Sequence, residues 1–500
     1  MQKKLSIAQI AAEVEPFSKT GGLANVMGSL PRSLRQLGHK VIVITPYYEN
    51  VSNIEGQVLE VILENEPVEV TQGIFETVTY LKGHLPDSKV LVYFISDNKK
   101  FPRTKELNGK LYGAADDNAK FLLFDVAALH LLEILDWKPD IIHCHDWHTG
   151  LIPYMIKNRY KKNPFWKKTS TLFTIHNLVY QFGHDWWLVP EDLRDDGRTP
   201  LPAFIDSEKI ERVNFAKRAI LNADAINAVS ETYRDEILTK DFGEDLHNIL
   251  KRREDRIFGI VNGINYNDFN PLTDTGIYKH YSHKSVGRKK DNKVHIQKYY
   301  KLKTGKQIPL ITMTSRIAEQ KGFGLLPEVI PSLMSLGAQM IVMGDGDEKI
   351  ISFLQDMQKQ FPKQFVYTLF DASMETSLYA GADIFLLPSR FEPCGVNQLV
   401  ALRYGCIPVV HHIGGLADTI VDFDPRTRVG NGFTTTRYDA ASLLVAIARA
   451  IETYKHKDVW RKLVVSGLRE ANSWIIPAKK YSELYRVTRR LRNKRMKKKE

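Results

Sequence analysis

Two glycines with a lysine beside them stand near the N-terminus of the sequence. Lys19, Thr20, Gly21 and Gly22 follow an apolar segment and precede an apparent helix that ends near Gly38. Adjacent glycines let backbone amides approach an anion, a helix start adds a partial positive charge, and Lys19 adds a full one. The pattern indicates a phosphate-binding loop, although it has neither the Walker nor the Gly-x-Gly-x-x-Gly spacing. The alternative is a plain turn that uses glycine for its backbone freedom.

Two further cations follow an apolar run in the second half of the chain. Arg316 and Lys321 come directly after the expected strand 310–314 and before a helical pattern. A guanidinium fork and an ammonium at one strand end suit a diphosphate. Each of them alone would more often be a surface salt-bridge partner. Together they predict a second anion site.

A carboxylate follows another buried strand. Glu392 comes after the expected strand 383–387, and a helix opens near Gly395. A carboxylate beside the amides of a helix start suits the recognition of sugar hydroxyls, with phosphate on the neighbouring amides. The alternative for Glu392 is a charge that offsets the helix dipole. Cys394 has no histidine and asparagine arranged around it, so a packing or positioning role is favoured over a nucleophile.

Histidines recur at two expected strand ends. The alternation of a strand places His143 and His145 on one face, and Asp146 follows them directly. His176 ends the next strand along the chain. A metal site is disfavoured because no carboxylate or cysteine lies at a familiar spacing. We expect Asp146 to accept hydrogen bonds and His176 to be functional, while a structural histidine remains the alternative.

The elements that position these residues alternate along the chain. The expected strands are 5–10, 41–45, 90–95, 140–144, 171–175, 225–229 and 257–261, then 310–314, 339–343, 365–369, 383–387 and 407–410. Helical patterns follow most of them, for example 116–135, 321–336 and 395–404. This alternation predicts parallel, helix-covered sheets with ligands beyond the carboxyl ends of their strands. Two such series predict two doubly wound domains that face a cleft, with a boundary near 262–265.

The overall composition is that of a globular protein with two domains or at most three. The 500 residues are 43% hydrophobic and 26% charged, and no apolar stretch reaches the length of a membrane helix. Three cysteines, Cys144, Cys394 and Cys406, cannot form a disulfide framework. We therefore expect a cytoplasmic protein without a signal peptide or a membrane span.

The net charge of +12 is concentrated at the C-terminus. Residues 486–500 contain nine lysines and arginines against one acid. A terminal block of like charge is typical of a solvated, frayed or disordered end, and contact with a polyanion or a membrane is the alternative. The rest of the chain is not basic enough to predict a nucleic-acid partner.

Taken together, these segments resemble the bacterial glycogen synthase and plant starch synthase family over nearly the whole chain. The resemblance is carried by Lys19–Leu23, His145–His148, Thr174–Asn177, Asn262–Ile264, Asn270–Asp274, Ser315–Arg316, Gln320–Gly322, Tyr379–Asp383, Pro388–Gly395 and Gly414–Thr419. It implies the two-domain GT-B fold, with an acceptor-side Rossmann-like domain at 1–262, a nucleotide-sugar donor domain at 263–480, and a crossing helix with a basic tail at 481–500.

The resemblance also implies roles for individual residues. Lys19, with the Gly21–Gly22 loop, and the pair Arg316 and Lys321 would hold the donor diphosphate. The other implied contacts are a nucleobase stacked on Tyr379, glucosyl hydroxyls held by Glu392 with the amides of Cys394 and Gly395, sugar contacts from His176 and Asn262, and an acceptor-side position for Asp146.

The implied reaction is transfer of glucose, with retention, from a nucleotide-glucose to the non-reducing end of an α-1,4-glucan such as glycogen or a maltooligosaccharide. No metal or other cofactor is expected. We favour ADP-glucose over UDP-glucose, although no motif encodes the base. Asn25, Asn397 and His411–His412 depart from the family pattern around the donor site, and Val400 stands where many related transferases have a second glutamate.

Two other functions fit the same residues less well. One is a GT-B transferase with another donor or acceptor, against which the Lys19–Leu23 loop argues. The other is a noncatalytic glucan-binding or initiation partner that kept the fold, against which the intact set of Lys19, Arg316, Lys321 and Glu392 argues.

Overall fold

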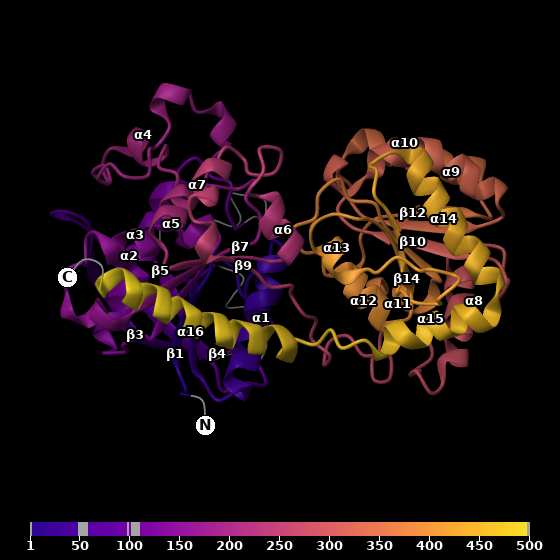
Figure 1. Cartoon of the computed structure of the whole chain (residues 1–500), viewed down its shortest axis with the longest axis horizontal. Helices are drawn as coiled ribbons and strands as arrows, with labels where there is room; N and C mark the ends of the chain where they lie inside the picture. Colours follow the sequence, from indigo (N-terminus) through magenta and orange to yellow (C-terminus); the bar gives the residue numbers. More distant parts are fainter. Residues whose placement is uncertain (1–2, 49–58, 98–99, 102–110, 498–500) are drawn as a thin grey trace. The chain divides into compact units, whose positions relative to one another are not determined.

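The computed structural model describes residues 3–48, 59–97, 100–101 and 111–497. The chain divides into two compact units, which we call unit 1 (Met1–Asn262 with Trp474–Glu500) and unit 2 (Gly263–Ser473). Each unit is built on one sheet with helices packed on it (Figure 1). The predicted fold class of two doubly wound α/β domains is therefore confirmed.

The sheet of unit 1 has nine strands in the order β3-β4-β5-β2-β1-β6-β7-β8-β9. From β5 to β9 all neighbours are parallel. The strands are β1 (Ser6–Ile10), β2 (Lys40–Pro46), β3 (Glu60–Thr71), β4 (Ile74–His84), β5 (Leu91–Ser96), β6 (Ile141–His145), β7 (Ser170–Ile175), β8 (Ala225–Ala228) and β9 (Ile257–Gly259).

The hairpin of β3 and β4 was not among the expected strands. The two strands pair antiparallel and join the sheet antiparallel to β5. Their side chains alternate between buried and exposed positions, most clearly in β4. Such half-exposed alternation is typical of an antiparallel edge rather than of a buried parallel strand. The search for continuous apolar runs therefore missed this hairpin.

Eight α-helices of unit 1 pack around this sheet in the described part of the chain. They are α1 (Gly22–Gln36), α2 (Asp117–Ile134), α3 (Leu151–Lys157), α4 (Ser207–Ile210), α5 (Phe215–Asn222), α6 (Glu231–Glu236), α7 (His247–Lys251) and α16 (Ile475–Lys497). None of the described helices of the protein is long and apolar enough to span a membrane.

Helix α16 begins at Ile475, ahead of the expected start at 481, and lies among the elements of unit 1 (Figure 1). Its buried face includes Ala478, Tyr481, Tyr485 and Thr488, which have helical spacing. Of these, Ala478, Tyr481 and Tyr485 share a hydrophobic core with residues of β1, α1 and neighbouring strands. The C-terminal segment is thus part of the packing of unit 1.

The expectation of a disordered or frayed end is wrong up to Lys497. Helix α16 is continuous to that residue, and residues 498–500 lie outside the described part. Arg489 pairs with Asp140 at 3.2 Å, and Arg495 pairs with Asp224 at 2.8 Å. Since Asp140 and Asp224 stand just before β6 and β8, the sheet supplies the counter-charges that the sequence alone did not reveal.

The sheet of unit 2 has six parallel strands in the order β12-β11-β10-β13-β14-β15. They are β10 (Leu310–Thr314), β11 (Gln339–Met343), β12 (Phe365–Thr368), β13 (Ile384–Leu387), β14 (Ile407–His411) and β15 (Phe433–Thr435). The helices are α8 (Lys289–Tyr299), α9 (Leu326–Ser335), α10 (Glu348–Gln360), α11 (Ala372–Gly381), α12 (Asn397–Arg403), α13 (Gly414–Thr419), α14 (Ala440–Lys455) and α15 (Lys457–Arg469).

Each sheet has one place where the strand order reverses. In unit 1 the chain moves from β1 outward to β2, then returns to β6 on the other side of β1. In unit 2 it moves from β10 to β11, then returns to β13 on the other side of β10. Ligands of doubly wound proteins bind beyond the carboxyl ends of strands at this switch point. Most predicted site residues follow β1, β6, β10 or β13 and so lie at these two places, whereas His176 follows β7, Asn262 follows β9 and Tyr379 lies within α11.

Candidate active site

At the switch point of unit 2, a lysine and a glutamate from two loops form an ion pair. Nζ of Lys321 lies 2.6 Å from Oε2 of Glu392, and Ser389 Oγ donates to the same oxygen at 3.0 Å. The two side chains are 20% and 10% exposed. Lys321 follows β10 and Glu392 follows β13, so the topology brings together residues that are far apart in the sequence.

Backbone contacts hold the two loops against each other. Gln320 accepts a hydrogen bond from the amide of Arg390 through its carbonyl, and its side chain donates to the carbonyl of Phe391. Gly322 has φ of +82°, and a Cβ there would collide with the carbonyl oxygen of Pro388. Glycine at position 322 therefore permits the close approach that places Lys321 beside Glu392.

Three other predicted residues of unit 2, Arg316, Cys394 and Gly395, lie on the same two loops. Arg316 is exposed and donates to Gln320 Oε1 at 3.4 Å. Cys394 is buried, and Gly395 has φ of +70° just before α12, which begins at Asn397 rather than near Gly395. Asn397 donates to the carbonyl of Thr314 at 3.2 Å. The site thus has one cation bound to the carboxylate and one turned toward solvent.

His411 supports the carboxylate indirectly. Its Nδ1 lies 2.9 Å from the carbonyl oxygen of Ser389, whose hydroxyl donates to Glu392. Burial lowers the pKa of His411. A neutral ring can donate to that carbonyl through Nδ1–H. His411, which departs from the family pattern, therefore holds the Ser389 backbone that positions Glu392. His412 is exposed.

The stacking role implied for Tyr379 is not compatible with this structure. Tyr379 is 0% exposed. Its hydroxyl shares a hydrogen bond of 2.8 Å with Thr314, and its ring packs edge-on against Phe385. Since the ring is enclosed by the core of unit 2, no face is open to a nucleobase. A tyrosine within a motif does not reveal whether its ring points out of the helix or into the core.

An exposed aromatic ring that the sequence analysis missed lies at the same edge of the sheet. Phe370 follows the end of β12 and is 52% exposed, and its neighbour Leu369 is 61% exposed. Large apolar side chains in water at a strand end are candidates for ligand contact. The signal in the sequence was the apolar pair Leu369 and Phe370, which spans the end of the expected strand 365–369.

At the switch point of unit 1, the glycine loop already holds an anion of the protein itself. Oε2 of Glu13 accepts from the amides of Thr20 and Gly21 at 2.5 and 3.0 Å. Helix α1 begins at Gly22, so the amides of its first turn have no acceptor within the helix. A Cβ at Gly21 or Gly22 would meet no atom within 4 Å. In the predicted phosphate loop, the amides of Thr20 and Gly21 are thus bound by a carboxylate. The amides of the first turn of α1 have no acceptor within the helix.

Lys19 lies at the surface beside this loop. Its Nζ pairs with Glu15 at 2.9 Å, and its side chain is 51% exposed. An exposed pair of this kind contributes little to stability, so Lys19 can exchange its partner at small cost. Its predicted contact with a diphosphate stays a prediction.

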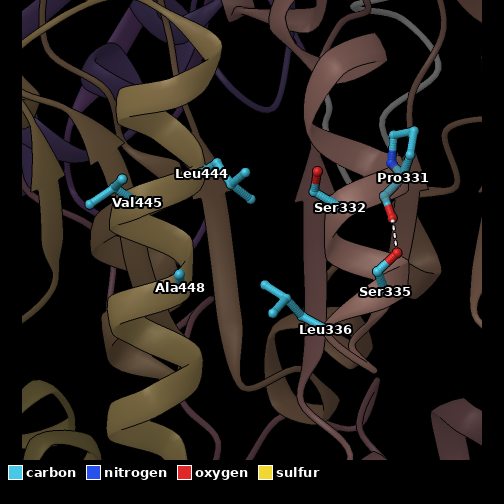
Figure 2. A pocket seen from close by; sticks show the side chains of 7 residues that line it. All are labelled: Pro331, Ser332, Ser335, Leu336, Leu444, Val445 and Ala448. Atoms are coloured by element: carbon cyan, nitrogen blue, oxygen red, sulfur yellow. Dashed lines mark hydrogen bonds between the residues drawn. The ribbon is translucent and has the colours of Figure 1, made fainter.

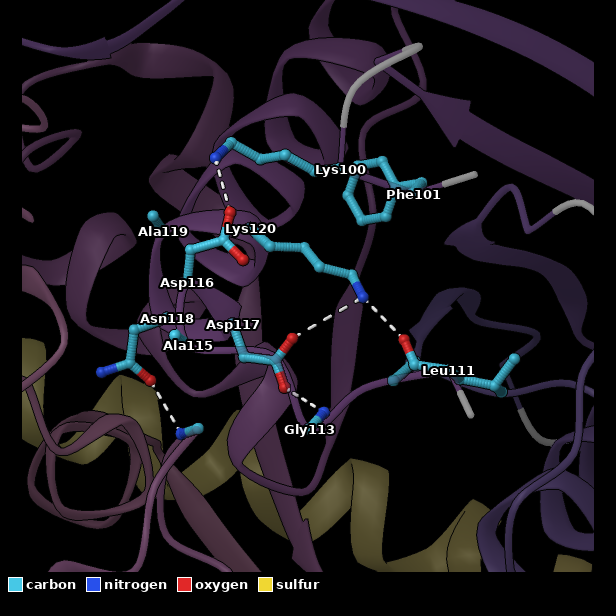
Figure 3. A network of polar contacts seen from close by, with 12 residues as sticks. Lys100, Phe101, Leu111, Gly113, Ala115, Asp116, Asp117, Asn118, Ala119 and Lys120 are labelled. Atoms are coloured by element: carbon cyan, nitrogen blue, oxygen red, sulfur yellow. Dashed lines mark hydrogen bonds and ion pairs between the residues drawn. The ribbon is translucent and has the colours of Figure 1, made fainter. Parts of the chain in front are cut away.

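Glu13 is itself held by Tyr112, whose two backbone neighbours belong to the polar network at the start of α2 shown in Figure 3. Tyr112 donates to Oε1 of Glu13 at 2.6 Å. On either side of Tyr112, the Leu111 carbonyl accepts from Lys120 at 2.6 Å, and the Gly113 amide donates to Asp117 at 2.5 Å. These two bonds hold the backbone on both sides of Tyr112. Tyr112 in turn orients Glu13, and Glu13 holds the glycine loop.

Asp146 fixes the backbone at the end of the next strand. Its Oδ1 accepts from the amides of His176 and Asn177 at 2.7 and 3.4 Å. Asp146 has φ of 55° and ψ of −179°, a region that glycine occupies and other residues rarely do. Burial raises its pKa to about 7. The strain is held because the carboxyl group ties the ends of β6 and β7 together.

The ring of His176 contacts a histidine of β6. His176 Nε2 lies 3.0 Å from Nδ1 of His145, and the His145 ring packs at 3.9 Å against His143. Burial lowers the pKa of His143 and His145 well below the usual value and that of His176 to about 3. These rings are neutral at physiological pH. Among the described residues, no group of three or more metal-ligating side chains could hold a metal ion.

A surface hollow elsewhere in unit 2 does not belong to this site. It is lined by Pro331, Ser332, Ser335, Leu336, Leu444, Val445 and Ala448 of α9 and α14 and the residue after α9 (Figure 2). Leu336 stands just before β11, so this hollow lies toward the amino ends of the strands. The site loops lie at the opposite edge.

Comparisons with known proteins match both units. A family model described as starch synthase catalytic domain matches residues 6–252, and one described as glycosyl transferases group 1 matches residues 298–463. Glycogen synthase of Geotalea daltonii is 40% identical over 488 residues, with 97% of this chain and 99% of the relative covered. The chain belongs to the glycogen and starch synthase family.

Other members of the family agree with this assignment. Glycogen synthase of Pseudothermotoga lettingae is 38% identical over 495 residues, covering 96% of this chain and 98% of the relative. The solved catalytic domain of starch synthase IV from Arabidopsis thaliana, bound to ADP and acarbose, has a TM-score of 0.84 at 31% identity. It covers 97% of this chain and 100% of that structure. The protein is therefore a glycosyltransferase of the glycogen and starch synthase type.

Proposed function

We propose that the protein transfers glucose from ADP-glucose, in preference to UDP-glucose, to the non-reducing end of an α-1,4-glucan with retention of configuration. The observation that carries the proposal is the pair of Lys321 and Glu392 at the switch point of unit 2. The ADP in the Arabidopsis starch synthase structure supports an adenine nucleotide. The three cysteines are buried and free, which supports the proposed cytoplasmic location.

Lys321 and Arg316 would stabilise the charge that develops on the leaving diphosphate. An ammonium has three N–H donors, so Lys321 can bind a phosphate oxygen while it keeps its bond to Glu392. Preorganised donors placed where charge develops lower the barrier of the reaction. The exposed guanidinium of Arg316 is free of carboxylate partners among the described residues, which suits a second phosphate contact.

Glu392 would accept hydrogen bonds from hydroxyls of the donor glucose, next to Cys394 and Gly395. His176 would contact the sugar, and Asp146 would hold the backbone that carries His176. Asn262 is buried, and its sugar contact stays a prediction. For the nucleobase we propose the exposed ring of Phe370 in place of the buried Tyr379.

Retention would follow from attack on the same face of the sugar from which the diphosphate leaves. The leaving phosphate oxygen would take the proton of the acceptor hydroxyl as the new glycosidic bond forms. No second carboxylate is required for this step, which agrees with Val400 at the position eight residues after Glu392. A double displacement would instead require a nucleophile and a separate acid and base.

The test is glucose incorporation into glycogen by the full-length protein with ADP-glucose and with UDP-glucose. We expect incorporation to be faster with ADP-glucose, and the added glucose to be released by an enzyme specific for α-1,4 links. Equal or greater incorporation from UDP-glucose would contradict the donor assignment. Binding of glycogen without release of nucleotide from either donor would instead indicate the noncatalytic alternative.

A further inference from the structure

The imidazole of His176 has one hydrogen-bond partner among the described residues, Nδ1 of His145 at 3.0 Å. The contact uses Nε2 of His176, and His176 itself is partly exposed, whereas His145 is 0% exposed. Nδ1 of His176 is therefore the nitrogen left for a ligand. Whether it donates or accepts depends on which ring gives the proton to the shared hydrogen bond.

The surroundings of Nε2 of His145 show which ring donates the proton. Nε2 of His145 is buried and has no hydrogen-bond partner in the described part of the chain. A neutral imidazole carries a single N–H. A buried N–H without an acceptor is rarer in proteins than a buried acceptor without a donor. The proton of His145 thus belongs on Nδ1, where it donates to Nε2 of His176.

The ring of His145 is also prevented from turning. His143 packs against it at 3.9 Å with an interplanar angle of 36°. His143 is fixed in turn by Thr174 Oγ1 at 2.7 Å and by the Tyr485 hydroxyl at 2.9 Å. Tyr485 belongs to α16, so the last helix of the chain supports the ring stack beneath His176.

We propose that His145 is a positioning residue that sets the tautomer of His176. It donates from Nδ1 to Nε2 of His176, so His176 carries its own proton on Nδ1 and offers that N–H to an oxygen of the ligand. Both rings are neutral because burial keeps them so. Only the identity of the ligand oxygen, a hydroxyl of the donor glucose, rests on the function proposed above.

The direct test is the tautomer of His176 in the full-length protein with ¹⁵N-labelled histidine rings. Long-range ¹H–¹⁵N correlation spectra show which ring nitrogen carries the proton, and the His176 signals are those lost in His176→Gln. We expect a proton on Nδ1 and none on Nε2. A proton on Nε2 of His176 in the unsubstituted protein would overturn the proposal.

Substitutions at position 145 separate the hydrogen bond from packing. His145→Leu removes the donor, and we expect His176 to move its proton to Nε2 at least in part, with kcat/KM lowered by about tenfold, the effect of one lost hydrogen bond. His145→Asn keeps an N–H donor near the place of Nδ1 and should restore the tautomer and most of the activity. An unchanged tautomer in His145→Leu would also overturn the proposal.

A matched control and a separate outcome complete the test. His130→Gln changes a partly exposed histidine that pairs with Glu66, and it should leave the His176 signals and the activity as they are. If His176→Ala kept full transferase activity, the ligand role in the proposed function would fail. The tautomer assignment would still stand or fall on the spectra alone.

Discussion

In unit 2 the switch point between β10 and β13 holds a charged pair, Lys321 with Glu392, on two loops that remain partly open to solvent. In unit 1 the ends of β6 and β7 hold Asp146 and His176, two groups whose charged forms are disfavoured by burial, while the Glu13 carboxylate lies nearby on the glycine loop. Burial lowers the pKa of His176 to about 3 and raises the pKa of Asp146 to about 7. The same topology thus positions a partly exposed ion pair in unit 2 and two groups with disfavoured charge in unit 1.

Under the proposed function, the difference would correspond to the two kinds of group in a nucleotide-sugar. A diphosphate carries full charge and is stabilised by cations in fixed positions. A sugar presents hydroxyls, which are best recognised by neutral donors and acceptors or by a carboxylate aimed at them. We therefore expect substitutions in unit 2 to act through charge and substitutions in unit 1 to act through hydrogen-bond geometry.

The largest effect is expected for Lys321→Ala. It removes the ammonium that we propose binds the diphosphate, and it leaves the buried Glu392 carboxylate without its ion-pair partner. We expect activity to fall by about two to three decades, as when a preorganised donor is lost. The measurement is kcat/KM with ADP-glucose and glycogen.

A control with the same change of charge is Lys359→Ala, on the exposed pair with Asp356 in α10. It should keep the activity of the unsubstituted protein. If Lys321→Ala retained more than half of that activity, charge at this switch point would have no catalytic role.

The next effect in size is expected for Glu392→Gln. A charge-assisted hydrogen bond to a glucose hydroxyl becomes a neutral one, which costs roughly 1–3 kcal/mol, or about one to two decades in kcat/KM. The bond from Ser389 Oγ can remain, so the loop should keep its conformation. Intact mass spectrometry after incubation with donor and a slow acceptor should show no glucosyl adduct. An increment of one glucose on Glu392 would disprove both the recognition role and the same-face mechanism.

A smaller effect on activity is expected at Asp146. Asp146→Asn keeps an oxygen that can accept from the His176 amide, and asparagine tolerates positive φ better than most residues. Asp146→Ala loses that acceptor and keeps the strained backbone. We expect kcat/KM within about threefold of the unsubstituted protein for Asn and about tenfold lower for Ala. Equal losses of kcat/KM in the two variants would mean that the charge of Asp146 matters more than its hydrogen bond. Substitutions in unit 1 would then act through charge, as those in unit 2 do.

The pH dependence of stability tests the same residue. The pKa of Asp146 is about 7 in the folded protein and about 3.9 in an unfolded chain. Its contribution to stability is therefore full at acidic pH and is lost as the pH rises through about 7. Relative to Asp146→Asn, the free energy of unfolding should fall by about 1 kcal/mol between about pH 5 and about pH 8, since partial exposure limits the shift. Urea titrations at both pH values measure it, and a rise with pH would contradict the assignment.

The smallest effect is expected for a chain that ends at Arg490. It loses the Arg495–Asp224 pair and the bond from Arg492 to the Lys167 carbonyl, but keeps the buried face of α16 up to Thr488. We expect a loss of about 1 kcal/mol in unfolding free energy and unchanged turnover, because the buried Asp224 keeps the hydrogen bond from the Thr171 amide. Lys480→Ala, on an exposed pair with Glu231, is the control and should change neither quantity. A failure to fold would show that the last turns of α16 are essential.

Most parallel strands of both sheets could be predicted because continuous apolar runs mark buried parallel strands, but the three-residue edge strand β15 was missed. The order of those strands then places Lys321 beside Glu392, which their separation in the sequence could not show. The antiparallel hairpin β3–β4 was missed because its alternating pattern is weaker than a buried run.

Parts of the site depend on side-chain directions that no motif records. Tyr379 stands in a family motif but points into the core, and Phe370 points outward without belonging to any motif. The carboxylate of Glu13 reaches the glycine loop only because the turn between β1 and α1 brings it back to Thr20 and Gly21. The predicted substrate contacts of the site residues, including Lys19, Arg316 and Asn262, stay predictions.

The return of Trp474–Glu500 to unit 1 makes that unit discontinuous in the chain. Unit 2 is made from one uninterrupted stretch, so its hydrophobic core can form before synthesis of the chain is complete. Unit 1 must wait for its last helix, since Tyr481 and Tyr485 complete the hydrogen bonds of Asn227 and His143. At ordinary synthesis rates the delay is on the order of tens of seconds. Through that interval the first half of the nascent chain exposes an unfinished sheet, and a chain that terminates early never finishes it.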